Sequence, residues 1–216
     1  LRRVRIAGPL SIDDLMERFG SVPLPPYITR QPRSEDRIRY QTVYATTDGS
    51  VAAPTAGLHF TSELLDAVAA RGAIAVDVLL HVGPGTFKPV DVDDPANHAM
   101  HAEWYAVPDA TARCIAEAKA RGSLVWAVGT TVARALEAAA TEHGIRVTAG
   151  WTDLFIFPPY RFKVVDRLLT NFHRPRSTLI MLVAAFAGYE STMAAYRAAV
   201  ADRYRLFSYG DAMAVV

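Results

Sequence analysis

Histidines gather in short polar loops of this sequence. Five of the six lie in such loops: His59, His81, His98, His101 and His173. Imidazole titrates near neutral pH, so such a side chain can take up or release a proton during a reaction. A single loop histidine is more often a structural hydrogen-bonding group, but core packing does not require this distribution. The pattern predicts an acid–base site assembled from distant loops.

Two loops combine glycine with threonine in a way that favours ligand binding. In HVGPGTF, Gly83 and Gly85 permit close approach of the backbone to a ligand and Thr86 supplies a hydroxyl, although two glycines alone are a weak signal. In AVGTT, an apolar stretch leads to Thr130 and Thr131 at an expected helix start. The free amides and the positive dipole end of such a helix attract a carboxylate or a phosphate. The two threonines could also simply cap the helix.

Two loops near the C-terminus carry further polar side chains. TNFHRPRST places Asn171, His173, Arg176 and Ser177 ahead of an apolar helix. SYGDAM contains Asp211, which could form a turn as readily as it could act as a base. Loops at the ends of strands and helices are where catalytic side chains are usually found.

A metal site is the weaker interpretation of the HAMHAEWY segment. His98, His101 and Glu103 could act as ligands, but their spacing is not that of HExxH and no cysteine lies nearby. The two histidines would share one face of a helix and would point to opposite sides of a strand. We therefore expect no bound metal.

The elements that must position these loops alternate between helix and strand. Alternating apolar residues predict a strand over 74–80, and a continuous apolar run predicts another over 124–128. Expected helices start at or after Ser11, Thr61, Asp109, Thr131, Ser177 or Thr178, and Ser191. This order predicts an α/β fold with a mixed, partly parallel sheet or a barrel-like arrangement, flanked by helices.

Composition limits the class of protein. About half of the 216 residues are hydrophobic, no apolar run approaches the length of a membrane span, and no signal-peptide pattern opens the chain, which predicts a cytoplasmic protein without membrane contact. The single cysteine, Cys114, excludes an internal disulfide framework and is expected to be buried in a helix.

The net charge of +1 gives no indication of nucleic-acid binding, but the basic residues are locally clustered. One cluster lies within 161–176 and a second within 30–39, where Glu35 and Asp36 interrupt it. For an arbitrary protein, a solvated face is the more common explanation of such a cluster.

The proline-rich stretch PLPPYI, residues 23–28, predicts a domain junction because proline stops a helix. We expect residues 1–20 to be the end of an N-terminal region and 21–216 to form a large α/β domain. The chain starts without methionine on a β-like phrase at 4–6, so an earlier natural start is expected.

Together these segments resemble the S-adenosylmethionine:tRNA ribosyltransferase-isomerase family. The resemblance covers nearly the whole chain in the family's order. Its motifs are PLPPYI, the 40–61 run that includes PTAGLHFT, HVGPGTFKPV, AVGTT, TDLFIFPPYRFKVVD, LLTNFHRPRSTLIMLVAAFAG and YRLFSYGDAM. So many separated matches are not explained by chance.

The resemblance implies a fold and a reaction. Family members hold a small β-barrel domain that would be mostly missing here, with 1–20 at its end. They transfer and isomerise the ribosyl part of S-adenosylmethionine onto 7-aminomethyl-7-deazaguanine (preQ1) at the tRNA wobble position. Epoxyqueuosine forms, and adenine and methionine leave. The absence of a Gly-rich dinucleotide fingerprint agrees with this unusual use of the molecule.

The resemblance also suggests roles for the residues singled out above. The expected catalytic residues are His59, His81, His101, Glu103 and His173, with His101 and Glu103 as the favoured proton-handling pair. The residues expected to bind S-adenosylmethionine are Gly83, Gly85, Thr86, Thr130, Thr131, Asn171 and Asp211. Those expected to contact tRNA are Tyr27, Arg30, Tyr160, Arg161, Lys163 and Arg176, with Tyr160, Phe162 and Tyr27 stacking on bases.

Two positions depart from the family pattern: Pro159 stands where glycine is expected, and Arg174 where an apolar residue is expected.

A monomer is favoured. A catalytically inactive relative or fragment that binds RNA or a nucleoside is the main alternative, and a metal-dependent hydrolase is the third.

Overall fold

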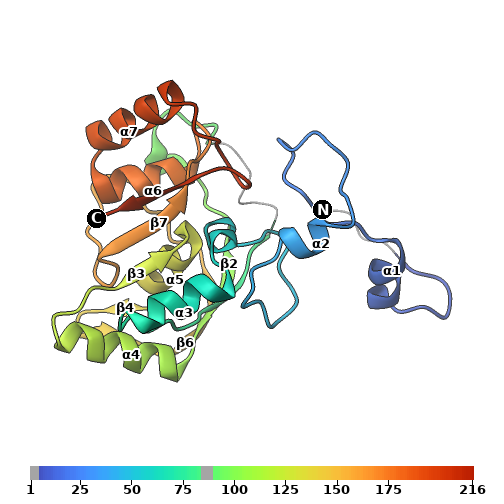
Figure 1. The fold of residues 1–216 in the computed structure, drawn as a ribbon, viewed down its shortest axis with the longest axis horizontal. Coiled ribbons are helices and arrows are strands. Elements are labelled where there is room, and N and C mark those ends of the chain that lie inside the picture. Colours follow the sequence, from blue (N-terminus) through green and yellow to red (C-terminus); the bar gives the residue numbers. More distant parts are fainter. Residues whose placement is uncertain (1–4, 84–89) are drawn as a thin grey trace.

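The computed structural model describes residues 5–83 and 90–216, which form an α/β body and an N-terminal arm (Figure 1). Sheet one is antiparallel in the order β1-β2-β6, and sheet two has the order β3-β7-β8, with β3 parallel and β8 antiparallel to β7. The strands of these sheets are β1 (Leu79–His81), β2 (Glu103–Val107), β3 (Trp126–Val128), β6 (Thr148–Thr152), β7 (Arg167–Asn171) and β8 (Ala212–Val215). A short hairpin joins β4 (Ala140–Thr141) to β5 (Gly144–Ile145).

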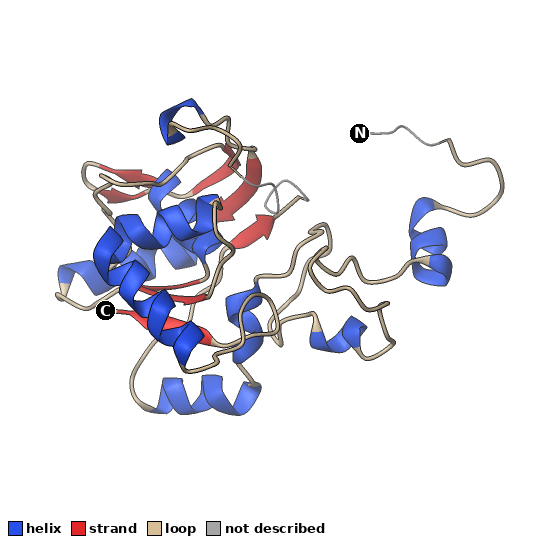
Figure 2. Ribbon diagram, turned by 90° about the horizontal axis from the view of Figure 1, so that it is seen from above, coloured by secondary structure: helices blue, strands red, loops and turns tan. Residues whose placement is uncertain are grey.

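The predicted mixed, partly parallel α/β fold is confirmed, and its barrel-like variant is not, because the sheets described here do not close into a barrel. Seen from above, the strands of the body lie among its helices (Figure 2). The α-helices are α1 (Ile12–Phe19), α2 (Asp36–Arg39), α3 (Ser62–Ala70), α4 (Asp109–Ala120), α5 (Thr130–Ala138), α6 (Thr178–Ala187) and α7 (Tyr189–Ala201). The described residues also include the short 3-10 helices η1 (Thr55–His59) and η3 (Pro95–Asn97).

Local cap signals located several helix starts correctly. Ser11, Thr61 and Ser177 are N-caps whose side chains accept hydrogen bonds from first-turn amides, so those predictions are confirmed. The prediction that α7 starts at Ser191 is wrong. Gly188, with φ of 85°, ends α6 and lets the next helix begin at once.

The predicted strand over 74–80 is shorter in the structure, where strand pairing begins only at Leu79. Ile74 and Val76 are 66% and 41% exposed, so their alternation buries no face. Alternation favours a strand only where a neighbouring strand is available to pair with it.

Helix α5 lies between the two sheets, since it contacts β1 and β2 of one and β3 and β7 of the other. Its buried side chains include Ala133, Ala135 and Leu136, and the small alanines permit close approach of both sheets. The same helix carries two buried charged groups, Arg134 and Glu137. Buried charges are stable only when they are paired or hydrogen-bonded.

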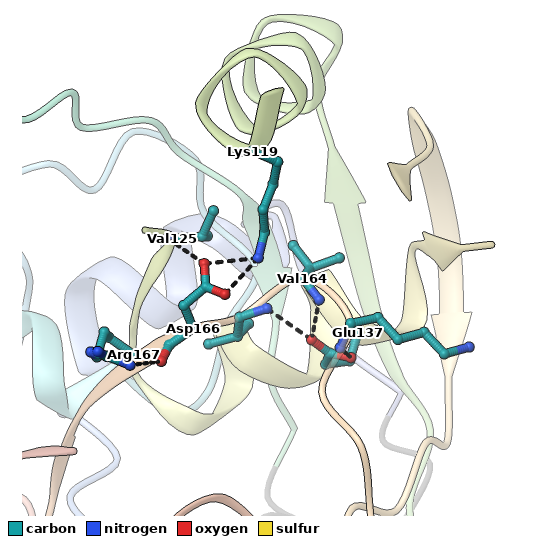
Figure 3. A network of polar contacts seen from close by, with 8 residues as sticks. Lys119, Val125, Glu137, Val164, Asp166 and Arg167 are labelled. Atoms are coloured by element: carbon teal, nitrogen blue, oxygen red, sulfur yellow. Dashed lines mark hydrogen bonds and ion pairs between the residues drawn. The ribbon is translucent and has the colours of Figure 1, made fainter. Parts of the chain in front are cut away.

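Glu137 holds the segment that leads into β7 (Figure 3). Its carboxylate accepts the main-chain N–H groups of Lys163, Val164 and Val165 at 2.9, 2.9 and 3.0 Å. The hydroxyl of Tyr160 donates to the same carboxylate at 3.2 Å. One buried side chain therefore satisfies several buried donors that no strand partner satisfies.

Asp166 fixes the start of the parallel strand pair in a similar way (Figure 3). Its carboxylate accepts from Lys119 Nζ at 2.6 and 2.8 Å and from the main-chain N–H of Val125 at 2.8 Å. Helix α4 and the entries to β3 and β7 thus meet at one carboxylate.

The N-terminal arm carries α1 away from the body (Figure 1). The apolar residues Ile12, Met16 and Phe19 of α1 are 61%, 59% and 77% exposed. An ion pair of Arg37 with Glu17, at 3.1 Å, joins α1 to α2. Of the β-like phrase at 4–6, residue 4 lies outside the described residues and the rest forms no strand, while the division at residue 20 stays a prediction.

Within the described ranges, no single helix has the length and apolar character needed to cross a membrane. Helices α6 and α7 together meet the criteria of length and composition, but the chain bends by 115° between them.

Replacing Glu137 with alanine should lower the free energy of unfolding by about 3 kcal/mol, because several buried amides lose a charged acceptor. Glu137→Gln should cost less, since one acceptor oxygen remains. Urea unfolding measures both, and Glu142→Ala, at an exposed position, serves as the control and should change stability by less than about 0.5 kcal/mol. A Glu137→Ala protein as stable as that control would contradict this role.

Candidate active site

A pocket opens at the carboxyl ends of β3 and β7, the two parallel strands. Its walls come from segments far apart in the sequence: Tyr27, 52–56, Val82, 128–132, 170–177, Leu179 and 207–208. Crevices at the carboxyl ends of parallel strands are the usual ligand sites of α/β sheets. The structure therefore brings the PTAGLHF, AVGTT, TNFHRPRST and SYGDAM motifs to one place.

The N-terminus of α5 forms one wall of this pocket. Its N-cap is Gly129, with φ of 101°, so no side chain caps the helix and the interpretation of Thr130 and Thr131 as mere caps is wrong. Both threonines line the pocket, and Thr130 is 5% exposed. Uncapped first-turn amides together with the helix dipole favour a bound carboxylate or phosphate.

Asn171 and His59 form a hydrogen-bonded pair between this pocket and η1. The Asn171 Nδ2 group donates to His59 Nε2 at 3.1 Å and to the carbonyl oxygen of Phe207 at 3.3 Å. In this arrangement Nε2 of the imidazole is an acceptor, so the neutral ring carries its proton on Nδ1. Asn171 is 2% exposed, and its Oδ1 is buried without a hydrogen bond from any described residue.

His173 lines the pocket and is held in place by two neighbours. Its Nε2 shares a hydrogen bond of 2.8 Å with Thr170 Oγ1, and its main-chain N–H donates to the hydroxyl of Tyr196 at 2.7 Å. Burial lowers the pKa of the His173 imidazole to about 4. The ring is therefore neutral at physiological pH and can accept or donate a hydrogen bond without carrying charge.

Asp211 forms a turn rather than a wall of the pocket. It accepts the main-chain N–H of Arg205 at 2.7 Å and the guanidinium of the same residue at 3.2 Å. These hydrogen bonds, and secondarily the positive charge of Arg205, lower the pKa of the Asp211 carboxyl. The contacts of Asp211 are those of a turn-forming residue. Its contact with S-adenosylmethionine stays a prediction.

The two residues predicted to transfer protons as a pair, His101 and Glu103, lie in different environments. Glu103 is buried and pairs with Arg134 Nη2 of α5 at 2.7 Å, whereas His101 is exposed. Burial raises the pKa of the Glu103 carboxyl, and the attraction of Arg134 opposes this rise. Geometrically, Glu103 ties sheet one to α5, and the catalytic role of the pair stays a prediction.

His81 lies at the end of β1, with its ring 4.9 Å from that of Trp104. The next residue, Val82, lines the pocket, whereas His81 itself is not among the lining residues. Of the glycine loop that follows, Gly83 is described, but the predicted ligand contacts Gly85 and Thr86 lie outside the described residues.

The residues considered as possible metal ligands do not form a cluster. The ring of His98 packs against Phe155 at 5.3 Å, and Glu103 is bound to Arg134. Throughout the residues that the structure describes, no group of three or more histidine, cysteine or acidic side chains is arranged to hold a metal ion.

Two of the residues predicted to contact RNA lie at the pocket. Tyr27 lines it, with its hydroxyl 2.5 Å from Ser208 Oγ, and the exposed Arg176 lies at its rim. Arg174 also lines the pocket, with its guanidinium carbon 5.9 Å from the centre of the Tyr27 ring. The sequence places Arg174 in the basic cluster and shows it as a departure from the family pattern, but it was not predicted to contact RNA. Sequence reasoning also missed Thr170 and Ser208, although both lie within motifs that it had selected.

The other predicted RNA contacts have structural partners or lie elsewhere. Arg30 binds Asp36 through two hydrogen bonds, of 2.6 and 2.7 Å, which hold the pKa of that carboxyl well below its usual range. Tyr160 donates to Glu137, and burial raises the pKa of its hydroxyl. Tyr160 and Phe162 pack against the core, where Phe162 contacts the ring of Phe186 at 4.6 Å. Both rings are thus partly buried, and their stacking role stays a prediction.

Arg161 and Lys163 are exposed but precede the start of β7, whereas the pocket lies beyond its end. They therefore occupy the opposite edge of sheet two from the pocket.

Comparison with known proteins gives the class of this chain. A family model described as "Queuosine biosynthesis protein" matches residues 1–215. A protein of Thiobacillus denitrificans named S-adenosylmethionine:tRNA ribosyltransferase-isomerase is 54% identical over 97% of this chain and 61% of its own length. A protein of the same name from Symbiobacterium thermophilum is 59% identical over 94% of this chain and 60% of its own length.

A solved structure supports the same class. The crystal structure of an S-adenosylmethionine tRNA ribosyltransferase from Thermotoga maritima is 48% identical and superposes with a TM-score of 0.63, covering 74% of this chain and 51% of that chain. The chain belongs to the queuosine biosynthesis protein family. It spans about 60% of the length of the curated relatives it matches.

The low pKa of His173 predicts how stability depends on pH. The pKa falls from 6.5 to about 4 on folding, so between these values the unfolded chain binds a proton that the folded chain does not. This contribution to stability is complete above pH 6.5 and is lost as the pH falls toward 4, by about 3 kcal/mol in all. Urea unfolding at pH 7 and pH 4.5, with wild type and His173→Gln, measures it; an equal loss of stability in both proteins would contradict it.

Proposed function

We propose that this chain transfers and isomerises the ribosyl group of S-adenosylmethionine onto preQ1 at the wobble position of tRNA, forming epoxyqueuosine and releasing adenine and methionine. The observation that carries the proposal is that several motifs resembling those of the family lie at one pocket. This pocket also contains an uncapped helix N-terminus. The names of the curated relatives support the same reaction.

We assign the methionine carboxylate of S-adenosylmethionine to the first-turn amides of α5. The hydroxyls of Thr130 and Thr131 lie at the same wall and can add donors. The dipole of α5 stabilises an anion there without a charged side chain in contact. This places the reacting ribosyl carbon toward the segment that holds Thr170, Asn171 and His173.

Proton transfers in this reaction need a group that accepts a proton beside the sulfonium and a group that donates to departing adenine. The Nδ1–H of His59 is a donor, because Asn171 occupies the Nε2 of that ring. His173, neutral and partly buried, offers a hydrogen-bonding partner of fixed position. The other proposed catalytic residues are His81, His101 and Glu103. Glu103 also holds α5 in place through its ion pair with Arg134.

The proposal includes tRNA carrying preQ1 as partner, S-adenosylmethionine as co-substrate without a metal, a monomeric protein and a cytoplasmic location, where tRNA is modified. Gly83, Gly85, Thr86, Asn171 and Asp211 remain proposed contacts of S-adenosylmethionine. The proposed tRNA contacts that line the pocket are Tyr27 and Arg176. The structure gives less support to the other proposed tRNA contacts, which are Arg30, Tyr160, Arg161 and Lys163.

A second candidate is an inactive relative that binds RNA or a nucleoside. Adenine release distinguishes the two, because only the enzyme cleaves the glycosidic bond.

Adenine release from S-adenosylmethionine in the presence of preQ1-modified tRNA tests the catalytic proposal. His59→Ala should lower kcat/KM by about 10²-fold to 10⁴-fold, the range of general acid–base catalysis. The same assay is applied to His81→Ala, His101→Ala and His173→Ala. His143→Ala, in the exposed β4–β5 turn, is the control and should remain fully active. Near-full activity of all four test variants would contradict the proposal.

The pocket rim predicts which basic residues contact the tRNA backbone. Replacing Arg174 and Arg176 together with alanine should weaken tRNA binding about tenfold at low salt, and the difference should shrink as salt rises. The matched variant changes Arg161 and Lys163, which carry the same charge at the opposite edge of sheet two, and should have a smaller effect. Titration of labelled tRNA at several salt concentrations measures both. A larger loss in the second variant would refute this assignment.

A further inference from the structure

Sheet one carries a row of aromatic side chains on its outer face. In the strand register, His81 of β1 pairs with Trp104 of β2, and Trp104 pairs with Trp151 of β6. Directly paired residues of antiparallel strands project to the same side of a sheet, with their Cβ atoms about 5 Å apart. The three rings therefore stand side by side across the whole sheet.

The row faces away from the core. Along β2 the alternate residues Glu103, Tyr105 and Val107 are buried, whereas Trp104 between them is only partly buried. Helix α5 covers the buried side, where Arg134 meets Glu103. The outer side is therefore the side on which the aromatic row stands.

The row is covered at one end and open at the other. The ring of His81 lies against Trp104 at 4.9 Å, and the backbone of Gly49 lies so close that a Cβ there would come within 2.5 Å of the imidazole. Trp151, at the other end, is 71% exposed. An exposed tryptophan beside further rings is unusual on the outer face of an antiparallel sheet, which normally carries polar residues.

We infer that this row, His81, Trp104 and Trp151, is a stacking surface for unpaired bases of RNA. The inference rests on the proposed function, in which the substrate base is part of an anticodon loop. Aromatic rings on an exposed sheet face stack on splayed bases, whose flat faces they match irrespective of sequence. Trp151 is exposed, whereas Tyr160 and Phe162 are partly buried against the core.

Continuity with the pocket selects RNA as the occupant. His81 is followed directly by Val82, which lines the pocket that is proposed to receive the substrate base. A strand of nucleotides whose reacting base enters the pocket thus passes next to the His81 end of the row. The neighbouring bases then reach Trp104 and Trp151.

Binding of an unmodified anticodon stem-loop RNA, followed by tryptophan fluorescence and by anisotropy of a labelled RNA, tests the inference. Trp151→Ala should weaken binding about tenfold, whereas Trp151→Phe should retain most of it, because stacking needs only an aromatic face. Trp126→Ala is the matched control, since Trp126 is 47% exposed on β3 of sheet two, and it should bind as the wild type does. The loss caused by Trp151→Ala should be equal at low and high salt, because no charge is removed.

A stem-loop bound equally by wild type and Trp151→Ala would overturn the inference, as would failure of the wild type to bind it, or equally tight binding of a fully paired RNA. A surface that instead binds protein would give one of these results. Thermal unfolding of each variant shows that a loss does not come from misfolding. Adenine release is measured separately: stacking without release leaves this inference standing and contradicts the proposed reaction.

Discussion

Parallel pairing of β3 with β7 determines where the functional loops of this protein lie. Because the two strands run in the same direction, the segment after Val128 and the segment after Thr170 emerge at the same edge of sheet two. A hydrogen bond of 2.8 Å from the Gly129 amide to the Leu169 carbonyl extends the pairing to the point where α5 begins. The helix N-terminus and the loop that holds His173 are therefore neighbours by topology.

The opposite edge of this strand pair is held by carboxylates. Asp166 joins α4 to the starts of both strands, and Glu137 satisfies the amides of the segment before β7. These contacts explain why a stretch with an apparently basic and aromatic character, YRFK, is a structural segment. Its amides and rings are turned to the core, and only the charges of Arg161 and Lys163 are left exposed.

Helix α5 connects the pocket to the second sheet. Its N-terminus forms the pocket wall to which we assign the methionine carboxylate, and one turn later Arg134 forms a buried ion pair with Glu103 of β2. Such a pair adds little net stability, but loss of one partner leaves an uncompensated buried charge. The position of the pocket wall thus depends on a residue that sequence reasoning selected as a proton-transfer group.

Local signals predicted the parts of the structure that depend on neighbours in the sequence. The helix starts at Ser11, Thr61 and Ser177 follow from side-chain caps. The sequence also predicts a cap at Thr131, whereas α5 begins after Gly129 without a side-chain cap. Partners distant in the sequence determined the rest. The ion pair of Glu103 and the row that ends at Trp151 appear only once strand register and helix placement are known.

We propose that the α5 N-terminus receives the methionine carboxylate of S-adenosylmethionine. A crystal structure of the protein with S-adenosylmethionine would show where this carboxylate lies. We expect electron density for the carboxylate within hydrogen-bonding distance of the Thr130 and Thr131 amides, with the ribose directed toward Asn171 and His173. Density for the ligand at any other place on the protein, with these amides facing solvent, would contradict it.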